Sequence, residues 1–73
     1  MLNKTLHPVS TITDLQAGDF VSIATDWGIG ETVNGLVTSI ELDIKPGMHG
    51  IGYELINGAR LWAYLTQVKG VWK

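Results

Sequence analysis

The dipeptide Asn57-Gly58 restricts the fold of this chain more than any other short stretch of its sequence. It joins residues 53–56 ("YELI") to residues 59–64 ("ARLWAY"), and both runs are rich in residues that favour β-strands. A type I′ turn needs positive φ at both central residues, which Asn and Gly tolerate best. The sequence therefore predicts a β-hairpin that turns at Asn57-Gly58.

The second strand of this hairpin has two different faces. Because successive side chains of a strand point to opposite sides, Leu61 lies on one face, and Arg60, Trp62 and Tyr64 share the other. We expect Leu61 to face the core and the other three side chains to face outward. Such an outward row, apolar in the middle and cationic at one end, is typical of a contact surface rather than of an active site.

Other segments also have the alternation of antiparallel strands, with one wet face. Residues 20–24 place Val21 and Ile23 on one face, and residues 68–72 form a short final strand after a single turn. The longest alternating run is residues 36–44. We expect its buried face to consist of Leu36, Thr38, Ile40, Leu42 and Ile44.

Turn-forming residues separate these strands. Residues 25–35 contain three glycines and predict a loop, and Pro46-Gly47 predicts a tight turn. One segment has a second interpretation, because the apolar residues of 59–70 also fit a helical period that ends at Gly70. The preceding Asn-Gly pair and the bulky composition of the segment favour the strand.

The length and the composition set limits on stability. A chain of 73 residues makes one domain and buries roughly 60% of the surface that its unfolded form exposes. Without cysteine it has no disulfide, so it must rely on a well-packed core or on self-association. We expect residues 1–13 to form an N-terminal arm or edge strand, with residues 9–13 as the pairing segment, and residues 14–73 to form the domain.

The order of the predicted elements resembles that of the SH3-like barrels. Many of these domains begin with a Leu-x-x-Gly-Asp-x-Val pattern, which Leu15, Gly18, Asp19 and Val21 supply, and end with a short turn carrying an apolar residue such as Leu65. The resemblance covers about residues 15–72. It implies an all-β fold, a five-stranded SH3-like barrel with an N-terminal arm, and it leaves the function open because this barrel has many functions.

The element order is also similar to that of the type II dihydrofolate reductases, which are tetramers that bind folate and NADPH in a shared pore. Those enzymes have a Val-Gln-Ile-Tyr stretch on the strand after the hairpin. Residues 60–63 (Arg-Leu-Trp-Ala) have neither the Gln nor the Tyr at the corresponding places. The resemblance therefore implies none of that activity here.

The residues with reactive side chains form no recognisable catalytic or metal-binding motif. No Gly-x-Ser-x-Gly elbow surrounds a serine, and His7 and His49 alone lack the further ligands that a metal site needs. Five basic against seven acidic residues argue against a dedicated nucleic-acid binder, and no apolar run reaches membrane-spanning length. We expect a cytoplasmic, non-catalytic protein without cofactor or metal.

The aromatic side chains carry the functional hypothesis. Trp27 lies in the glycine-rich loop, where it either covers the end of the core or serves as an exposed recognition residue. We expect Trp27, Arg60, Trp62 and Tyr64 to bind a protein partner, either another protein or a second copy of the chain, unless the N-terminal arm covers the hairpin. The alternatives are a barrel that binds single-stranded nucleic acid and a small oligomeric enzyme.

Overall fold

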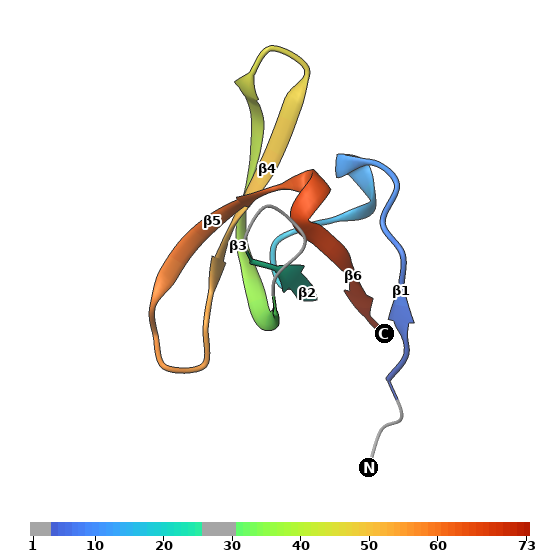
Figure 1. The fold of residues 1–73 in the computed structure, drawn as a ribbon, viewed down its shortest axis with the longest axis vertical. Coiled ribbons are helices and arrows are strands. Elements are labelled where there is room, and N and C mark those ends of the chain that lie inside the picture. The colour runs from blue at the N-terminus through green and yellow to red at the C-terminus, as the bar shows by residue number, and fades with distance from the viewer. Residues whose placement is uncertain (1–3, 26–30) are drawn as a thin grey trace.

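The computed structural model describes residues 4–25 and 31–73, and these residues form an all-β structure, as the sequence predicted (Figure 1). The elements follow one another as β1 (Leu6–His7), η1 (Ile12–Asp14), β2 (Phe20–Ala24), β3 (Thr32–Lys45), β4 (Met48–Glu54), β5 (Arg60–Tyr64), η3 (Leu65–Gln67) and β6 (Val68–Trp72). The elements η1 and η3 are single turns of 3₁₀ helix. The helical alternative for residues 59–70 is wrong, because β5 and β6 occupy most of that segment.

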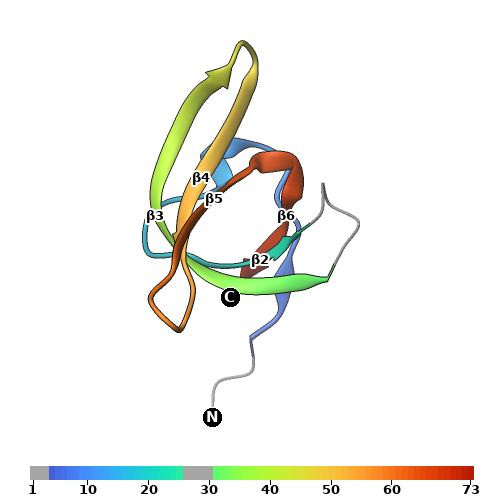
Figure 2. The same cartoon turned by 60° about the vertical axis from the view of Figure 1, so that its left-hand side comes forward.

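The strands form one antiparallel sheet of six strands in the order β1-β6-β2-β3-β4-β5. This differs from the expected five-stranded barrel, because β1 adds a sixth strand beside β6 and no ladder joins β1 to β5 in the described residues. The sheet is strongly curved, and η3 carries the chain from β5 at one end to β6 near the other (Figure 2). The curvature gives the sheet a concave face and an outer face.

The main core lies on the concave face. Val21 and Ile23 of β2 are buried there as predicted, and Ile51 and Tyr53 of β4 face them. Burial raises the pKa of the Tyr53 phenol above its ordinary value. Among the described residues, the buried cluster consists of Ile12, Leu15, Val21, Ile23, Val37, Ile51, Tyr53, Ala63, Val68 and Val71.

A turn at Gly18 precedes β2 and ties that strand to β3. Gly18 has a φ of 98°, a conformation that glycine adopts without steric cost. Its N–H donates to the Val37 carbonyl (2.8 Å), and the Val37 N–H donates to the Asp19 carbonyl (2.8 Å). These bonds extend the β2–β3 pairing beyond the ends of β2.

A bulge in β3 changes which residues face the core. Val37 lies opposite Tyr53 and Ser39 lies opposite Gly52, so Thr38 has no opposite residue. An extra residue reverses the alternation of side chains along the strand. Val37 is therefore buried before the bulge and Ile40 packs on the core after it, whereas Leu36 is exposed.

The prediction of one buried face from Leu36 to Ile44 is therefore wrong. Leu42 and Ile44 are also exposed, because they lie where the β3–β4 hairpin projects beyond the rest of the sheet (Figure 1). The projecting hairpin turns at Pro46-Gly47 as predicted, with Gly47 at a φ of 76°.

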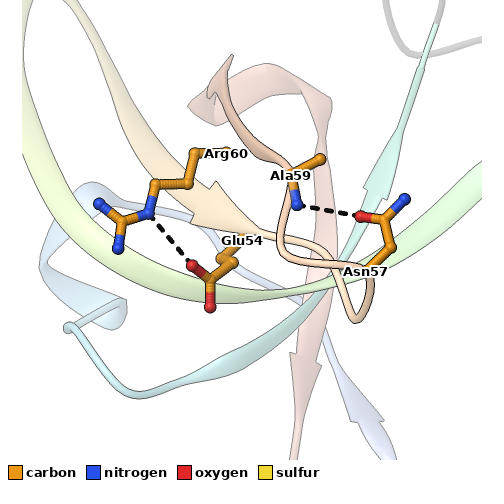
Figure 3. A network of polar contacts seen from close by, with 4 residues as sticks. All are labelled: Glu54, Asn57, Ala59 and Arg60. Carbon is orange, nitrogen blue, oxygen red and sulfur yellow. Dashed lines mark hydrogen bonds and ion pairs between the residues drawn. The ribbon is translucent and has the colours of Figure 1, made fainter.

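The loop between β4 and β5 differs from the predicted type I′ turn. Of its residues only Gly58 has positive φ (89°), and its N–H donates to the Leu55 carbonyl (2.9 Å). Leu55 pairs with Ala59 through a 2.8 Å hydrogen bond, so the loop contains three residues, and the Asn57 side chain accepts the Ala59 N–H at 3.0 Å (Figure 3). This is the three-residue hairpin loop that ends in a left-handed glycine.

The additional loop residue determines the faces of β5. In the observed register, Tyr53 lies opposite Leu61 and Gly52 lies opposite Trp62. A two-residue loop would place Trp62 opposite Tyr53 instead, on the core face. The predicted turn type was wrong, because the loop has three residues and not the two of a type I′ turn. In the register that this longer loop sets, Leu61 and Trp62 lie on the predicted faces.

The N-terminal arm pairs at the edge of the sheet, but not through residues 9–13. Leu6 and His7 form β1 beside β6, at the end of the sheet away from β5. Residues 9–13 lead into η1, where the Asp14 carboxylate accepts the Thr11 and Ser10 N–H groups (3.0 Å each) and its pKa is lowered by these bonds. The described part of the arm, residues 4–13, therefore contributes Ile12 to the core and pairs at the end of the sheet away from β5.

We predict that Gly58→Val destabilises the protein by about 1 kcal/mol or more, because a β-branched residue resists positive φ. The matched variant Gly58→Asn should cost less, since Asn tolerates the left-handed region. Urea denaturation followed by tryptophan fluorescence measures both. Equal unfolding midpoints for the two variants would contradict the observed loop conformation.

Candidate functional site

Trp62 and Tyr64 form an aromatic pair on the outer face of β5. Their ring centroids are 5.0 Å apart and their planes meet at 86°, an edge-to-face contact. The two rings differ in exposure, since Trp62 remains 58% exposed and Tyr64 only 8%. The structure therefore brings the predicted aromatic residues together, but only Trp62 is available to a partner, and the expectation of an exposed Tyr64 is wrong.

Two glycines of β4 lie opposite this pair in the β4–β5 ladder. Gly50 lies opposite Tyr64 and Gly52 lies opposite Trp62. A Cβ atom on Gly50 would meet the Ala63 carbonyl oxygen and the Ile44 Cδ1 atom, the latter at 2.6 Å. A Cβ atom on Gly52 would meet the Ser39 Oγ atom at 2.6 Å. The absence of side chains at these two positions allows Ile44 and Ser39 of β3 to lie close to β4.

The projecting hairpin covers Tyr64 from the other side. Between Glu41 and Lys45, three residues of β3 oppose the single residue His49 of β4, and Asp43 has a φ of 52°. The Asp43 N–H donates to His49 Nδ1 (3.0 Å), which helps to hold this conformation.

This irregularity returns β3 side chains to the outer face. Ile44 thereby approaches Gly50: a Cβ atom added to Gly50 would lie 2.6 Å from the Ile44 Cδ1 atom. The Lys45 Nζ atom lies 6.0 Å from the centroid of the Tyr64 ring, at the limit of a cation–π contact. Tyr64 is thus covered by residues of its own chain, which explains its burial outside the main core.

A shallow hollow lies beside Trp62. Its volume is about 320 Å³, and Ser39, Glu41, Ile44, Gly52 and Trp62 line it. The lining offers an aromatic ring, an aliphatic side chain, a hydroxyl and one carboxylate. This set can accept an apolar side chain with a hydrogen-bond donor or a cation beside it. We call Trp62, Ile44, Gly52, Ser39 and Glu41 the Trp62 surface.

Arg60 lies on the same face but is already paired. Its Nε atom donates to Glu54 Oε1 at 3.1 Å (Figure 3). Its side chain is nevertheless 79% exposed, so the pair contributes little to stability. Arg60 therefore lies at the edge of the Trp62 surface, where its charge is paired with that of Glu54.

The remaining predicted residues have different outcomes. Trp27 belongs to residues 26–30, which lie outside the described residues, so its role stays a prediction. Leu61 lies on the predicted side of β5, opposite Tyr53, but it is 47% exposed and is not part of the buried core cluster. Sequence reasoning missed Ile44 and the pair Gly50 and Gly52 as parts of the surface. The signal was present in "GIG" at residues 50–52, which matches the spacing of "WAY" at residues 62–64.

The described side chains do not gather into a metal centre. In the part of the chain that the structure describes, no group of three or more His, Asp or Glu residues is arranged to hold a metal ion. His49 is half-buried, and its Nδ1 atom lies 3.9 Å from the Asp43 carboxylate. In residues 4–25 and 31–73, no helix has the length and apolar character needed to cross a membrane.

Comparison of the chain with family models, with curated proteins and with solved structures gave no match.

The two glycines give a prediction with a built-in control. Gly50→Ala should destabilise the protein by about 1–3 kcal/mol, because the new methyl group meets the backbone carbonyl of Ala63, which is held in the ladder. Gly52→Ala should cost clearly less, because its nearest neighbour is the rotatable Ser39 hydroxyl. Urea unfolding midpoints compare the two variants. A larger loss for Gly52→Ala would contradict the described packing.

Proposed function

We propose that this protein is a small non-catalytic interaction module that binds an extended segment of another protein across the Trp62 surface. One observation carries the proposal: Trp62 is 58% exposed, although its ring contacts the buried Tyr64 edge to face and lies opposite Gly52 in the ladder. An indole exposed to this degree contributes little to the core. Tryptophan is among the residues most enriched at the energetic centres of protein interfaces.

The rigidity of the surface supports binding. The Trp62 ring contacts the buried Tyr64 edge to face, and Tyr64 is in turn covered by the projecting hairpin. A side chain held in this way loses little conformational entropy when a partner covers it. The surface is therefore organised before binding, as interfaces of small modules usually are.

The position of β5 supports an extended partner. It is the last strand in the order of the sheet, so in the described part of the chain no strand pairs with its second edge. A free strand edge can accept the backbone of an extended peptide, whose alternate side chains then lie over the face of the sheet. An added strand beside β5 would place such a side chain near Trp62.

The charges near the hollow indicate the chemistry of the partner. Glu41 lines the hollow, and the exposed carboxylate of Asp43 lies on the same projecting hairpin. Arg60 is compensated by Glu54. We therefore expect a partner segment that combines an apolar side chain for the hollow with a Lys or Arg side chain beside it.

The proposal includes the relationship to the SH3-like barrels. The curved antiparallel sheet, the single turn η3 before the last strand and the Leu15-to-Val21 pattern at the start of β2 all support it. The absence of cysteine suits a cytoplasmic protein. Neither point is needed for the binding hypothesis, which depends on the Trp62 surface alone.

Site-specific photo-cross-linking in the native cell tests the proposal. A photoreactive phenylalanine analogue at position 62 should cross-link to a defined protein, whereas the same analogue at the exposed position Thr66 should not. Cross-links to nucleic acid only, or the same products from both positions, would reject the proposal in favour of the alternatives.

A binding titration with the cross-linked segment as a synthetic peptide measures the contribution of the indole. Trp62→Ala should weaken binding by about 30-fold or more, the scale of an interface hot spot. The free energy of unfolding should change by about 1 kcal/mol or less, because the ring is mostly exposed. Thr66→Ala is the matched control and should change neither quantity. Unchanged affinity of the Trp62 variant would show that the segment binds elsewhere.

A further inference from the structure

A second apolar groove lies near the β4–β5 loop. Its volume is about 630 Å³. Its apolar walls are Phe20 of β2, Val33 and Leu36 of β3, and Leu55 and Ile56 after β4. Phe20 and Leu36 lie opposite each other in the β2–β3 ladder and are each 42% exposed. The groove is therefore separate from the Trp62 surface, with which it shares no lining residue.

The side-chain oxygens of both asparagines at this groove, and one oxygen of Glu54, already have partners within the chain. Asn34 Oδ1 accepts the Trp72 Nε1–H (3.0 Å), Asn57 Oδ1 accepts the Ala59 N–H (3.0 Å), and Glu54 pairs with Arg60. A polar small molecule would find few groups that fix its orientation. The groove is therefore suited to an apolar side chain.

Ile56 is the unexplained residue of this region. It is fully exposed at the tip of the three-residue loop, on the rim of the groove. The loop conformation depends on Gly58 and on the Asn57 side chain, so it does not require a branched apolar residue at position 56. This region therefore has both a protruding apolar side chain, Ile56, and an apolar groove that can accept such a side chain.

We propose that two copies of the chain associate through this region, with Ile56 of each copy inserted into the groove of the other. A two-fold dimer uses the same patch on both subunits, so the patch must be complementary to itself. A projection and a groove that lie side by side on one surface meet this requirement. A different partner protein would explain the groove but not the exposed side chain on its rim.

The charges on the rim are also self-complementary. Glu54 lines the groove and is paired with Arg60, so a two-fold axis that passes close to this pair would bring each arginine toward the glutamate of the second copy. Arg60 uses its Nε atom for its own Glu54 and has a side chain that is 79% exposed, which leaves guanidinium donors for a second carboxylate. The net charge of −2 gives only weak repulsion between two copies.

The size of the chain gives a reason for association. A domain of 73 residues without cysteine has a limited core and no disulfide. Phe20, Leu36 and Ile56 together expose more apolar surface in one place than scattered surface residues usually do. Covering these residues in a dimer would add the burial that one copy alone lacks.

Sedimentation velocity over a range of protein concentrations tests this proposal. The wild type should dimerise, and Ile56→Ser should raise the dimer dissociation constant about tenfold or more. Leu42→Ser is the matched control, since it removes an equally large exposed side chain (63% exposed) from the projecting hairpin, and it should leave the dimer intact. Circular dichroism verifies that both variants remain folded.

Charge reversal provides a second, independent arm. Arg60→Glu should weaken the dimer, and the double variant Glu54→Arg/Arg60→Glu should restore it, because the exchange recreates both ion pairs. A wild type that remains monomeric up to about 1 mM, an equal effect of Leu42→Ser and Ile56→Ser, or open-ended polymers would each overturn the two-fold dimer. Trp62→Ala should leave the dimer unchanged, so this proposal and the proposed function fail separately.

Discussion

The register between β4 and β5 is the constraint on which the outer face of this protein depends. It places Gly50 opposite Tyr64 and Gly52 opposite Trp62, so each aromatic side chain has a residue without a side chain across from it. The three-residue loop ending in Gly58 sets this register. A shift by one residue would bring the indole to the core face and remove the exposed surface altogether.

The same sheet supports apolar packing on both faces, because two irregularities in β3 change which of its side chains point to which face. The bulge at Thr38 exchanges the faces of β3 so that Val37 and Ile40 both reach the main core. The second irregularity, around Asp43, returns Ile44 to the outer face beside Gly50. One strand of 14 residues therefore packs against the core along its first part and supports Tyr64 along its last part. Bulges commonly redirect side chains near functional surfaces in this way.

Much of the fold was predictable because short-range chemistry determines it. The strand at Val21 and Ile23 and the turns at Gly18 and Gly47 follow from apolar alternation and from backbone conformations that glycine alone adopts easily. Two of the errors have one common cause. The residue types around Thr38 do not reveal the bulge there, and those before Ala59 do not reveal the length of the loop. Each of these two features shifts the alternation of side chains by one residue. The pattern alone therefore misassigned Leu36 and the type of turn.

The sequence by itself determined an all-β chain, the positions of most strands, and an aromatic row on β5 that includes Trp62. Only the tertiary structure decided that Tyr64 is covered while Trp62 is open, that Arg60 is paired with Glu54, and that the N-terminal arm lies at the opposite end of the sheet. The reason is physical: strand formation depends on neighbours along the chain, whereas exposure depends on which distant strands pair and in which register.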